Sequence, residues 1–166
     1  MGLVVDDCRA ADIPVLVARL PSPTGRAGIH ADRYQAQQVG TCTYLVARLD
    51  GQLAGHVLIE WSGCQASEVY HDFLGVPEIC SLLVHRDLRG KGIGTALIAA
   101  AERRAAERGR RRVGMGVATD NTRAQALYQR LGYRPARAYL NRWTVMGADG
   151  IRRHKTEPSR YLIKDL

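Results

Sequence analysis

The first sixty residues show apolar runs that change between the period of a strand and that of a helix. Residues 3–9 (LVVDDCR) predict a strand, and residues 11–20 (ADIPVLVARL) predict a helix with a proline in its first turn. Residues 29–40 predict a second, short helix that ends at a glycine. Residues 41–61 hold two apolar runs separated by an Asp-Gly pair, which is typical of a β-hairpin.

The middle of the chain is expected to hold a buried strand followed by an amphipathic helix. Residues 62–77 are polar and predict a long loop, rich in side chains that could line a site. Residues 77–84 (PEICSLLV) are apolar nearly throughout, as in a strand at the centre of a sheet. A helix of about a dozen residues follows the glycines at 90–94. Its buried stripe is expected at Ile93, Leu97, Ala101 and Ala105.

The last third of the chain predicts a strand, a helix and two further strands. Residues 111–119 predict a strand, after which Asn121 is expected to cap a helix. Strands are predicted at 133–146 and 160–166, joined by the basic loop 147–159. The inward face of the helix is expected at Ala124, Leu127, Tyr128 and Leu131.

The composition is that of a folded globular protein, with 46% hydrophobic and 24% charged residues in a chain of 166. Helices inserted among hairpins, without repeats or linkers, predict a single mixed α/β domain over residues 1–166. No apolar run approaches the ~20 residues that span a bilayer. The N-terminal segment carries acidic residues where a signal peptide has basic ones, so we expect a cytoplasmic protein.

The four cysteines are scattered along the chain, with neither a CxxC pair nor a close cysteine–histidine pairing. Such spacing does not favour a zinc site or a disulfide framework, so we expect reduced thiols and no metal. These cysteines are Cys8, Cys42, Cys64 and Cys80.

Positive charge is concentrated around the glycine-rich segment. The chain has a formal net charge of +8. Residues 85–112 alone contain nine Lys or Arg residues against three acidic ones. This concentration indicates an anionic ligand near the glycines or a nucleic-acid surface, although several of these arginines would also suit a solvated helix face.

The glycines Gly90, Gly92 and Gly94 stand between a predicted strand and a predicted helix. A Walker A loop requires GxxxxGK[ST], but Lys91 is followed here by a glycine. The dinucleotide fingerprint GxGxxG fails because Thr95 occupies the place of its third glycine. Bare backbone at the start of a helix nevertheless suits a phosphate, because unpaired N–H groups can approach it closely.

Two segments together resemble the GCN5-related N-acetyltransferase (GNAT) family. The run Arg89–Gly94 (RGKGIG) is similar to that family's pyrophosphate loop, [QR]xxGx[GA]. Residues 117–135 (VATDNTRAQALYQRLGYRP) resemble its later segment, with an Asn, then a Tyr seven residues on, then Leu-Gly-Tyr. The resemblance implies the GNAT fold, in which a mixed, mostly antiparallel central sheet is splayed in the middle and about four helices lie on its faces.

The same resemblance implies acetyl-CoA, or another acyl-CoA, as co-substrate. In the family the pantetheine arm enters the splay of the sheet, which implies backbone contacts along residues 82–84 and an oxyanion donor there. Asn121 would bind the same arm. The implied binding residues are Leu82, Leu83, Val84, Arg89, Gly90, Lys91, Gly92, Ile93, Gly94, Thr95, Asn121, Ala124 and Tyr128.

The resemblance also implies two catalytic side chains. Tyr128 matches the family's usual general acid, which protonates the leaving thiolate; packing on the apolar helix face is the other reading. Glu78 opens the central strand, where several members of the family place a base for the attacking ammonium. Rival bases are Glu60, His71 and Asp72, whereas His85 lies on the pyrophosphate side and is a poor candidate.

The acceptor is expected to be a primary amine of a small molecule or a protein, and the sequence leaves its identity open. Glu68 and Asp72 would suit a cationic substrate. Dimers are common in the family, and the terminal strand offers an edge for a homodimer. Further candidates to line the acceptor pocket are His30, Asp32, Tyr34, Tyr70, His71 and Trp143.

Two alternative functions stay open at this stage. A non-catalytic acyl-CoA sensor would keep the glycine loop and could dispense with Tyr128 and Glu78. A basic nucleic-acid-binding or ribosome-associated module would use the arginines on phosphates, but it would not need the RxxGxG pattern at a helix start.

Overall fold

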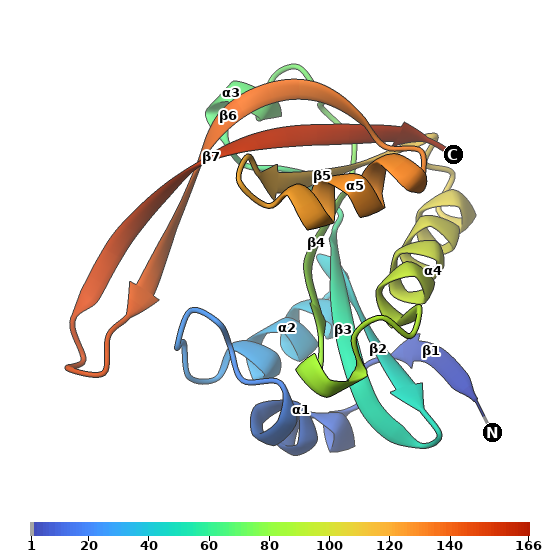
Figure 1. Ribbon diagram of the computed structural model, residues 1–166, viewed down its shortest axis with the longest axis vertical. Helices are drawn as coiled ribbons and strands as arrows, with labels where there is room; N and C mark the ends of the chain where they lie inside the picture. Colours follow the sequence, from blue (N-terminus) through green and yellow to red (C-terminus); the bar gives the residue numbers. More distant parts are fainter. Residues whose placement is uncertain (1) are drawn as a thin grey trace.

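The computed structural model describes residues 2–166, which form one seven-stranded sheet with helices on both faces (Figure 1). The strand order across the sheet is β1-β2-β3-β4-β5-β7-β6, and only the β4–β5 pair is parallel. The expected mixed, mostly antiparallel sheet is therefore confirmed. The strands are β1 (Leu3–Asp7), β2 (Cys42–Leu49), β3 (Gln52–Glu60), β4 (Glu78–Val84), β5 (Arg112–Ala118), β6 (Arg134–Met146) and β7 (Arg152–Asp165).

The helices divide between the two faces according to the alternation of side chains along the strands. Val57 and Ile59 face a core that includes α4 and α5, whereas Leu58 faces α1 and α2. The short helix α3 packs with β7 and β6 on the same face as α1 and α2. The helices are α1 (Ile13–Arg19), α2 (Ile29–Gln38), α3 (Ser67–Tyr70), α4 (Ile93–Glu107) and α5 (Thr122–Arg130).

The expected stripe of α4 and the expected cap of α5 are found in place, whereas the expected inward face of α5 is only half-buried. All four residues of the predicted α4 stripe are buried, and the side chain of Asn121 caps α5 by accepting a hydrogen bond from the Ala124 N–H at 3.1 Å. The predicted loop 62–77 differs from the expectation, because it contains α3. That helix is a single turn, too short for a hydrophobic period to reveal it.

The sheet opens between β4 and β5. The two strands pair only at Glu78 and Gly114, supported by a hydrogen bond of 2.9 Å from the Gly114 N–H to the Pro77 carbonyl. Beyond this point the strands diverge, so the rest of β4 carries backbone groups with no partner on that side. The splay that the GNAT resemblance implied is therefore present.

A β-bulge interrupts β4 next to the splay. Cys80 lies opposite Leu58, and Leu83 lies opposite His56, so two residues of β4 face the single residue Val57 of β3. One of these two, Ser81, has φ of +54°, a left-handed conformation that is uncommon for a residue with a side chain. The bulge therefore turns the backbone of β4 at the point where β5 leaves it.

The last hairpin corrects two expectations. The predicted basic loop 147–159 is mostly strand, because β7 begins at Arg152 and pairs with β6 from Met146 onward. The sequence did not reveal this part of β7, because its residues are mostly charged and an exposed hairpin shows no alternation of apolar and polar residues. The terminal strand β7 also lies inside the sheet, between β5 and β6, so β6 is the edge strand. A dimer edge at the terminal strand is therefore wrong.

The outer half of the β6–β7 hairpin extends from the body as an arm that reaches the loop between α1 and α2 (Figure 1). The Met146 N–H donates to the Thr24 carbonyl at 3.1 Å. Gly25 fits this contact because a Cβ there would lie 2.9 Å from the Met146 carbonyl oxygen. Within residues 2–166, no helix has the length and apolar character needed to cross a membrane.

Candidate active site

A cavity of about 530 Å³ lies beside the splay, between the second half of β4, the start of α4 and helix α5. It brings together all the predicted cofactor-binding residues except Lys91. It also contains Leu88, Arg123, Leu127 and Arg130, which the sequence reasoning missed. A signal for the last three existed in the helical spacing, since Arg123, Leu127 and Arg130 follow one another at intervals of four and three along α5 and therefore share a face.

The glycine loop at one end of this cavity has the backbone that a phosphate site needs. Gly90 and Gly92 have φ of +78° and +77°, and a Cβ at either position would meet nothing within 4 Å. Gly92 is the N-cap of the 15-residue helix α4, so the unpaired N–H groups of its first turn face the cavity end. Partial positive charge therefore gathers where the backbone is bare.

Arginines add formal charge to the same cavity. The Arg89 Nε donates to the Val84 carbonyl at 3.3 Å, which fixes this side chain across the end of β4. Arg123 and Arg130 line the opposite wall on α5, and neither forms a salt bridge among the described residues. The cavity is therefore electropositive and suited to an anionic ligand.

Tyr128 lies on the wall of this cavity formed by α5. Its ring packs edge-on against Tyr133 at 6.3 Å between centroids, and it contacts the main core. Burial raises the pKa of Tyr128 above its ordinary value, so the phenol holds its proton throughout the physiological range. This is the protonation state that a general acid requires.

Glu78 lies apart from Tyr128, in a second cavity of about 440 Å³ on the opposite face of the sheet. Cys64 and Tyr139 line the same cavity. Burial raises the pKa of Glu78 to about 7, reinforced by the negative charge of Glu60 and opposed by a hydrogen bond from Cys64. A carboxylate poised near neutrality can accept a proton at physiological pH.

Glu60 faces Glu78 directly across the β3–β4 pair. It lines a third cavity, of about 280 Å³, together with Arg33, Cys80 and Ser81. Burial raises the pKa of Glu60, and the Arg33 guanidinium opposes this effect. The two glutamates are therefore neighbours on one face of the sheet. Glu60 lines the cavity beside α2, and Glu78 lines the cavity beside α3.

The other acidic acceptor candidates are engaged by arginines. Glu68 accepts from Arg142 at 3.2 Å, and Asp72 pairs with Arg137 at 2.8 Å. Asp72 and His71 are exposed, and neither lines one of these cavities. Of the acidic candidates from the sequence, Glu68 and Asp72 form salt bridges, whereas Glu60 and Glu78 form none among the described residues.

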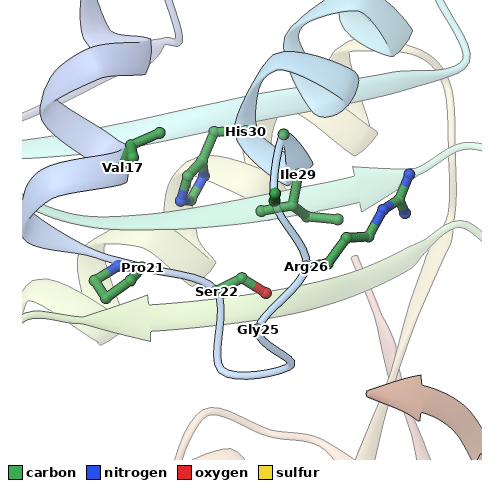
Figure 2. A pocket seen from close by; sticks show the side chains of 9 residues that line it. Val17, Pro21, Ser22, Gly25, Arg26, Ile29 and His30 are labelled. Carbon is green, nitrogen blue, oxygen red and sulfur yellow. The ribbon is translucent and has the colours of Figure 1, made fainter. Parts of the chain in front are cut away.

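His30 is buried, and both of its ring nitrogens are engaged within the protein. Its Nε2 lies 2.8 Å from the Leu20 carbonyl, so this nitrogen carries the proton and donates. The Nδ1 then accepts from the Tyr44 hydroxyl at 2.7 Å. The histidine forms the inner wall of a cavity of about 210 Å³ between α1 and α2, around which Val17 and Ile29 also lie (Figure 2).

A matched pair of glycine variants tests the loop. Gly90→Ala is expected to weaken binding of acetyl-CoA, the ligand that the GNAT resemblance implies, at least tenfold, because the new methyl group would stand where backbone must approach phosphate. Gly75→Ala is the control, since its φ of +77° and its open surroundings impose the same backbone strain far from the loop. Isothermal titration measures both affinities. Equal affinities for the two variants would contradict a phosphate role for Gly90.

The family model described as the acetyltransferase (GNAT) family matches residues 15–133. This range includes the glycine loop, the splayed strands and Tyr128. Because the match covers more than half of the chain, the protein belongs to the GNAT acetyltransferase family.

Curated relatives agree with this assignment. The chain is 32% identical over 90 residues to acetyltransferase ECA0875 of Pectobacterium atrosepticum, covering 54% of this chain and 56% of that protein. It is 40% identical over 106 residues to the mycothiol acetyltransferase of Clavibacter sepedonicus, covering 63% of this chain and 31% of that protein. The chain thus matches between about a third and just over half of the length of these relatives.

Solved structures share the fold at low identity. An N-acetyltransferase from Staphylococcus aureus Mu50 superposes with a TM-score of 0.72 at 16% identity, covering 99% of each chain. The yncA protein of Salmonella typhimurium, a putative acetyltransferase solved with acetyl-CoA, gives a TM-score of 0.71 at 18% identity, covering 100% of this chain and 95% of that one. The expected GNAT fold is confirmed.

Proposed function

We propose that this protein is an N-acetyltransferase that transfers the acetyl group of acetyl-CoA to a primary amine by direct attack on the thioester. One observation carries the proposal. A single electropositive cavity joins the glycine loop, the N-terminus of α4, the open edge of β4 and the phenol of Tyr128.

The residues of this cavity fit acetyl-CoA. Its glycine end offers bare backbone N–H groups and arginines, which suit a pyrophosphate. The open edge of β4 at residues 82–84 offers backbone groups without a strand partner, which suit the amides of pantetheine. Apolar walls from Leu88 and Leu127 complete a cavity large enough for a flexible arm.

Two groups of the chain would act on the thioester. A backbone N–H at the β4 bulge, near Leu82, would stabilise the oxyanion that forms when the amine attacks, and such a donor is typically worth about 3 kcal/mol. Tyr128 would donate its proton to the leaving thiolate when the tetrahedral species collapses. The C–N bond would form as the C–S bond breaks, the nitrogen would lose one proton to solvent as it becomes an amide, and Tyr128 would recover from solvent the proton that it gives to the thiolate.

A carboxylate on the other face would take a proton from the incoming ammonium. Glu78 is our preferred base, because its pKa of about 7 leaves much of it ionised at neutral pH while keeping it basic enough to accept. Glu60 lies across from it and is the rival. The cavities that these two residues line lie on the same face of the sheet, beside the first half of β4. An acceptor that enters from this face would therefore come close to both carboxylates.

Glu78→Gln is expected to lower kcat/KM for the amine about 100-fold at pH 7.5 and to flatten the acid limb of its pH profile. In the wild type this limb should fall as the pH drops through about 7, because protonated Glu78 cannot accept a proton. Glu60→Gln is the matched control and should keep the limb. If Glu78→Gln keeps the acid limb of the pH profile and Glu60→Gln loses it, then Glu60 is the general base.

The decisive experiment measures free thiol released from acetyl-CoA across a panel of primary amines, peptides with free N-termini and lysine side chains. Release that depends on both the amine and the protein supports the transferase. Tight acetyl-CoA binding without release for any amine would favour the acyl-CoA sensor. Salt-dependent RNA binding without acetyl-CoA binding would favour the nucleic-acid module.

A further inference from the structure

His56 is a buried imidazole without a hydrogen-bond partner. It lies on β3, it is 2% exposed, and neither ring nitrogen forms a hydrogen bond among the described residues. Burial lowers the pKa of His56 to about 3, helped by the positive charge of Arg33, so the ring is neutral. A neutral imidazole keeps one N–H donor and one acceptor nitrogen, and leaving both unpaired costs stability.

The surroundings of His56 do not explain its presence by packing alone. Its ring lies edge-on to His30 and Tyr44, with centroids 5.5 and 5.6 Å away. Those two side chains satisfy each other and the Leu20 carbonyl, so they offer His56 no hydrogen bond. A leucine of similar volume would fill the same space without the polar penalty.

The position of His56 along the sheet is informative. It stands opposite Leu83, at the end of the β4 bulge, and Ser81 occupies that bulge with φ of +54°. The Ser81 carbonyl is the nearby backbone group that favours the protonated ring. The imidazole therefore faces the peptide that joins Ser81 to Leu82, although the two do not reach hydrogen-bond geometry in the free protein.

The orientation of that peptide matters for the proposed reaction. A trans peptide points its C=O and its N–H in opposite directions. If the Ser81 carbonyl is held toward β3 and His56, the Leu82 N–H points toward the splay between β4 and β5. Leu82 borders the cavity that also contains Tyr128. The same peptide thus connects the buried histidine to the place where the thioester carbonyl would lie.

We propose that His56 is a positioning residue that holds the Ser81 carbonyl and thereby aims the Leu82 N–H at the thioester oxygen. The inference rests on the proposed function. His56 forms this hydrogen bond to the Ser81 carbonyl only when acyl-CoA occupies the splay. For this reason its ring has no partner in the free protein. His56 neither accepts a proton nor touches the reacting atoms.

His56→Leu is expected to lower kcat tenfold or more while leaving the affinity for free CoA unchanged, because free CoA has no thioester carbonyl. Its melting temperature should stay the same or rise, since an unpaired polar group is removed. His56→Gln should recover part of kcat, because its amide N–H can replace the donor. Val46→Ala, beside His56 on β2, is the control that should lose stability but not kcat.

A wild-type kcat in His56→Leu would overturn the proposal, as would a His56→Gln variant no better than the leucine variant. So would a kcat that falls only in step with melting temperature, as in Val46→Ala. The ¹⁵N resonance of Leu82 tests positioning without turnover: acetyl-CoA should shift it more than CoA does, and His56→Leu should abolish the difference. An inactive wild type would reject the proposed function, and this resonance would still decide the role of His56.

Discussion

Tyr128→Phe is expected to lower kcat about 100-fold while the affinity for acetyl-CoA stays within about twofold. The substitution removes only the hydroxyl, so the ring still packs on the core and still lines the cavity. Loss of a positioned general acid typically costs a factor of 10² to 10⁴. Thiol release and isothermal titration measure the two quantities separately.

Tyr133→Phe is the matched control for this experiment. Its ring lies 6.3 Å from that of Tyr128, but its hydroxyl donates to Glu102 at 2.8 Å, and Tyr133 lines none of the four cavities described above. The control should lose about 1 kcal/mol of stability and keep its turnover. An unchanged kcat in Tyr128→Phe would leave that tyrosine with a packing role only.

Gly114→Ala is expected to destabilise the fold by about 3 kcal/mol or more, or to prevent folding. A Cβ at this position would overlap the hydroxyl oxygen and the Cζ of Tyr161. Tyr161 is fully buried and cannot move aside. Gly114 also supplies the pairing with Glu78 across the splay, so the clash falls where β4 and β5 meet.

Urea denaturation measures this effect, and a double variant explains it. Tyr161→Leu should lose stability by itself, because it leaves a cavity. Combined with Gly114→Ala, it should cost less than the sum of the two single changes, since it removes the clashing atoms. Additive losses, or a Gly114→Ala variant with wild-type stability, would contradict a steric role for Gly114.

Much of the fold follows from local sequence signals that need no tertiary information. The Asp50–Gly51 turn, the cap at Asn121 and the stripe of α4 depend on neighbours in the chain, and each appears as expected. The position of β7 does not. The outer half of β7 is exposed and charged, and the sequence of its inner half predicts only a short strand. Its pairing with both β5 and β6 depends on contacts between residues far apart in the sequence.

The candidate site also combines features that follow from local sequence with features that depend on the tertiary structure. The glycine loop and Tyr128 belong to two short motifs, and those motifs sufficed to select the residues that line one cavity. The bulge at Ser81 and the unpaired ring of His56 have no local signature, because both arise from the register between β3 and β4. Likewise, the sequence suggests that Glu68 and Asp72 could bind a cationic substrate, but both form salt bridges to arginines that are distant in the sequence.

The inserted position of β7 imposes an order on the assembly of the sheet. Until β7 has taken its place, β6 has no neighbour in the sheet, because only β7 joins it to β5. The half of the sheet that contains β1 to β4 can pair earlier, because each of these strands pairs with the next strand along the chain. The long β6 strand therefore stays unpaired until β7 takes its place, and an unpaired strand of this kind is prone to aggregate.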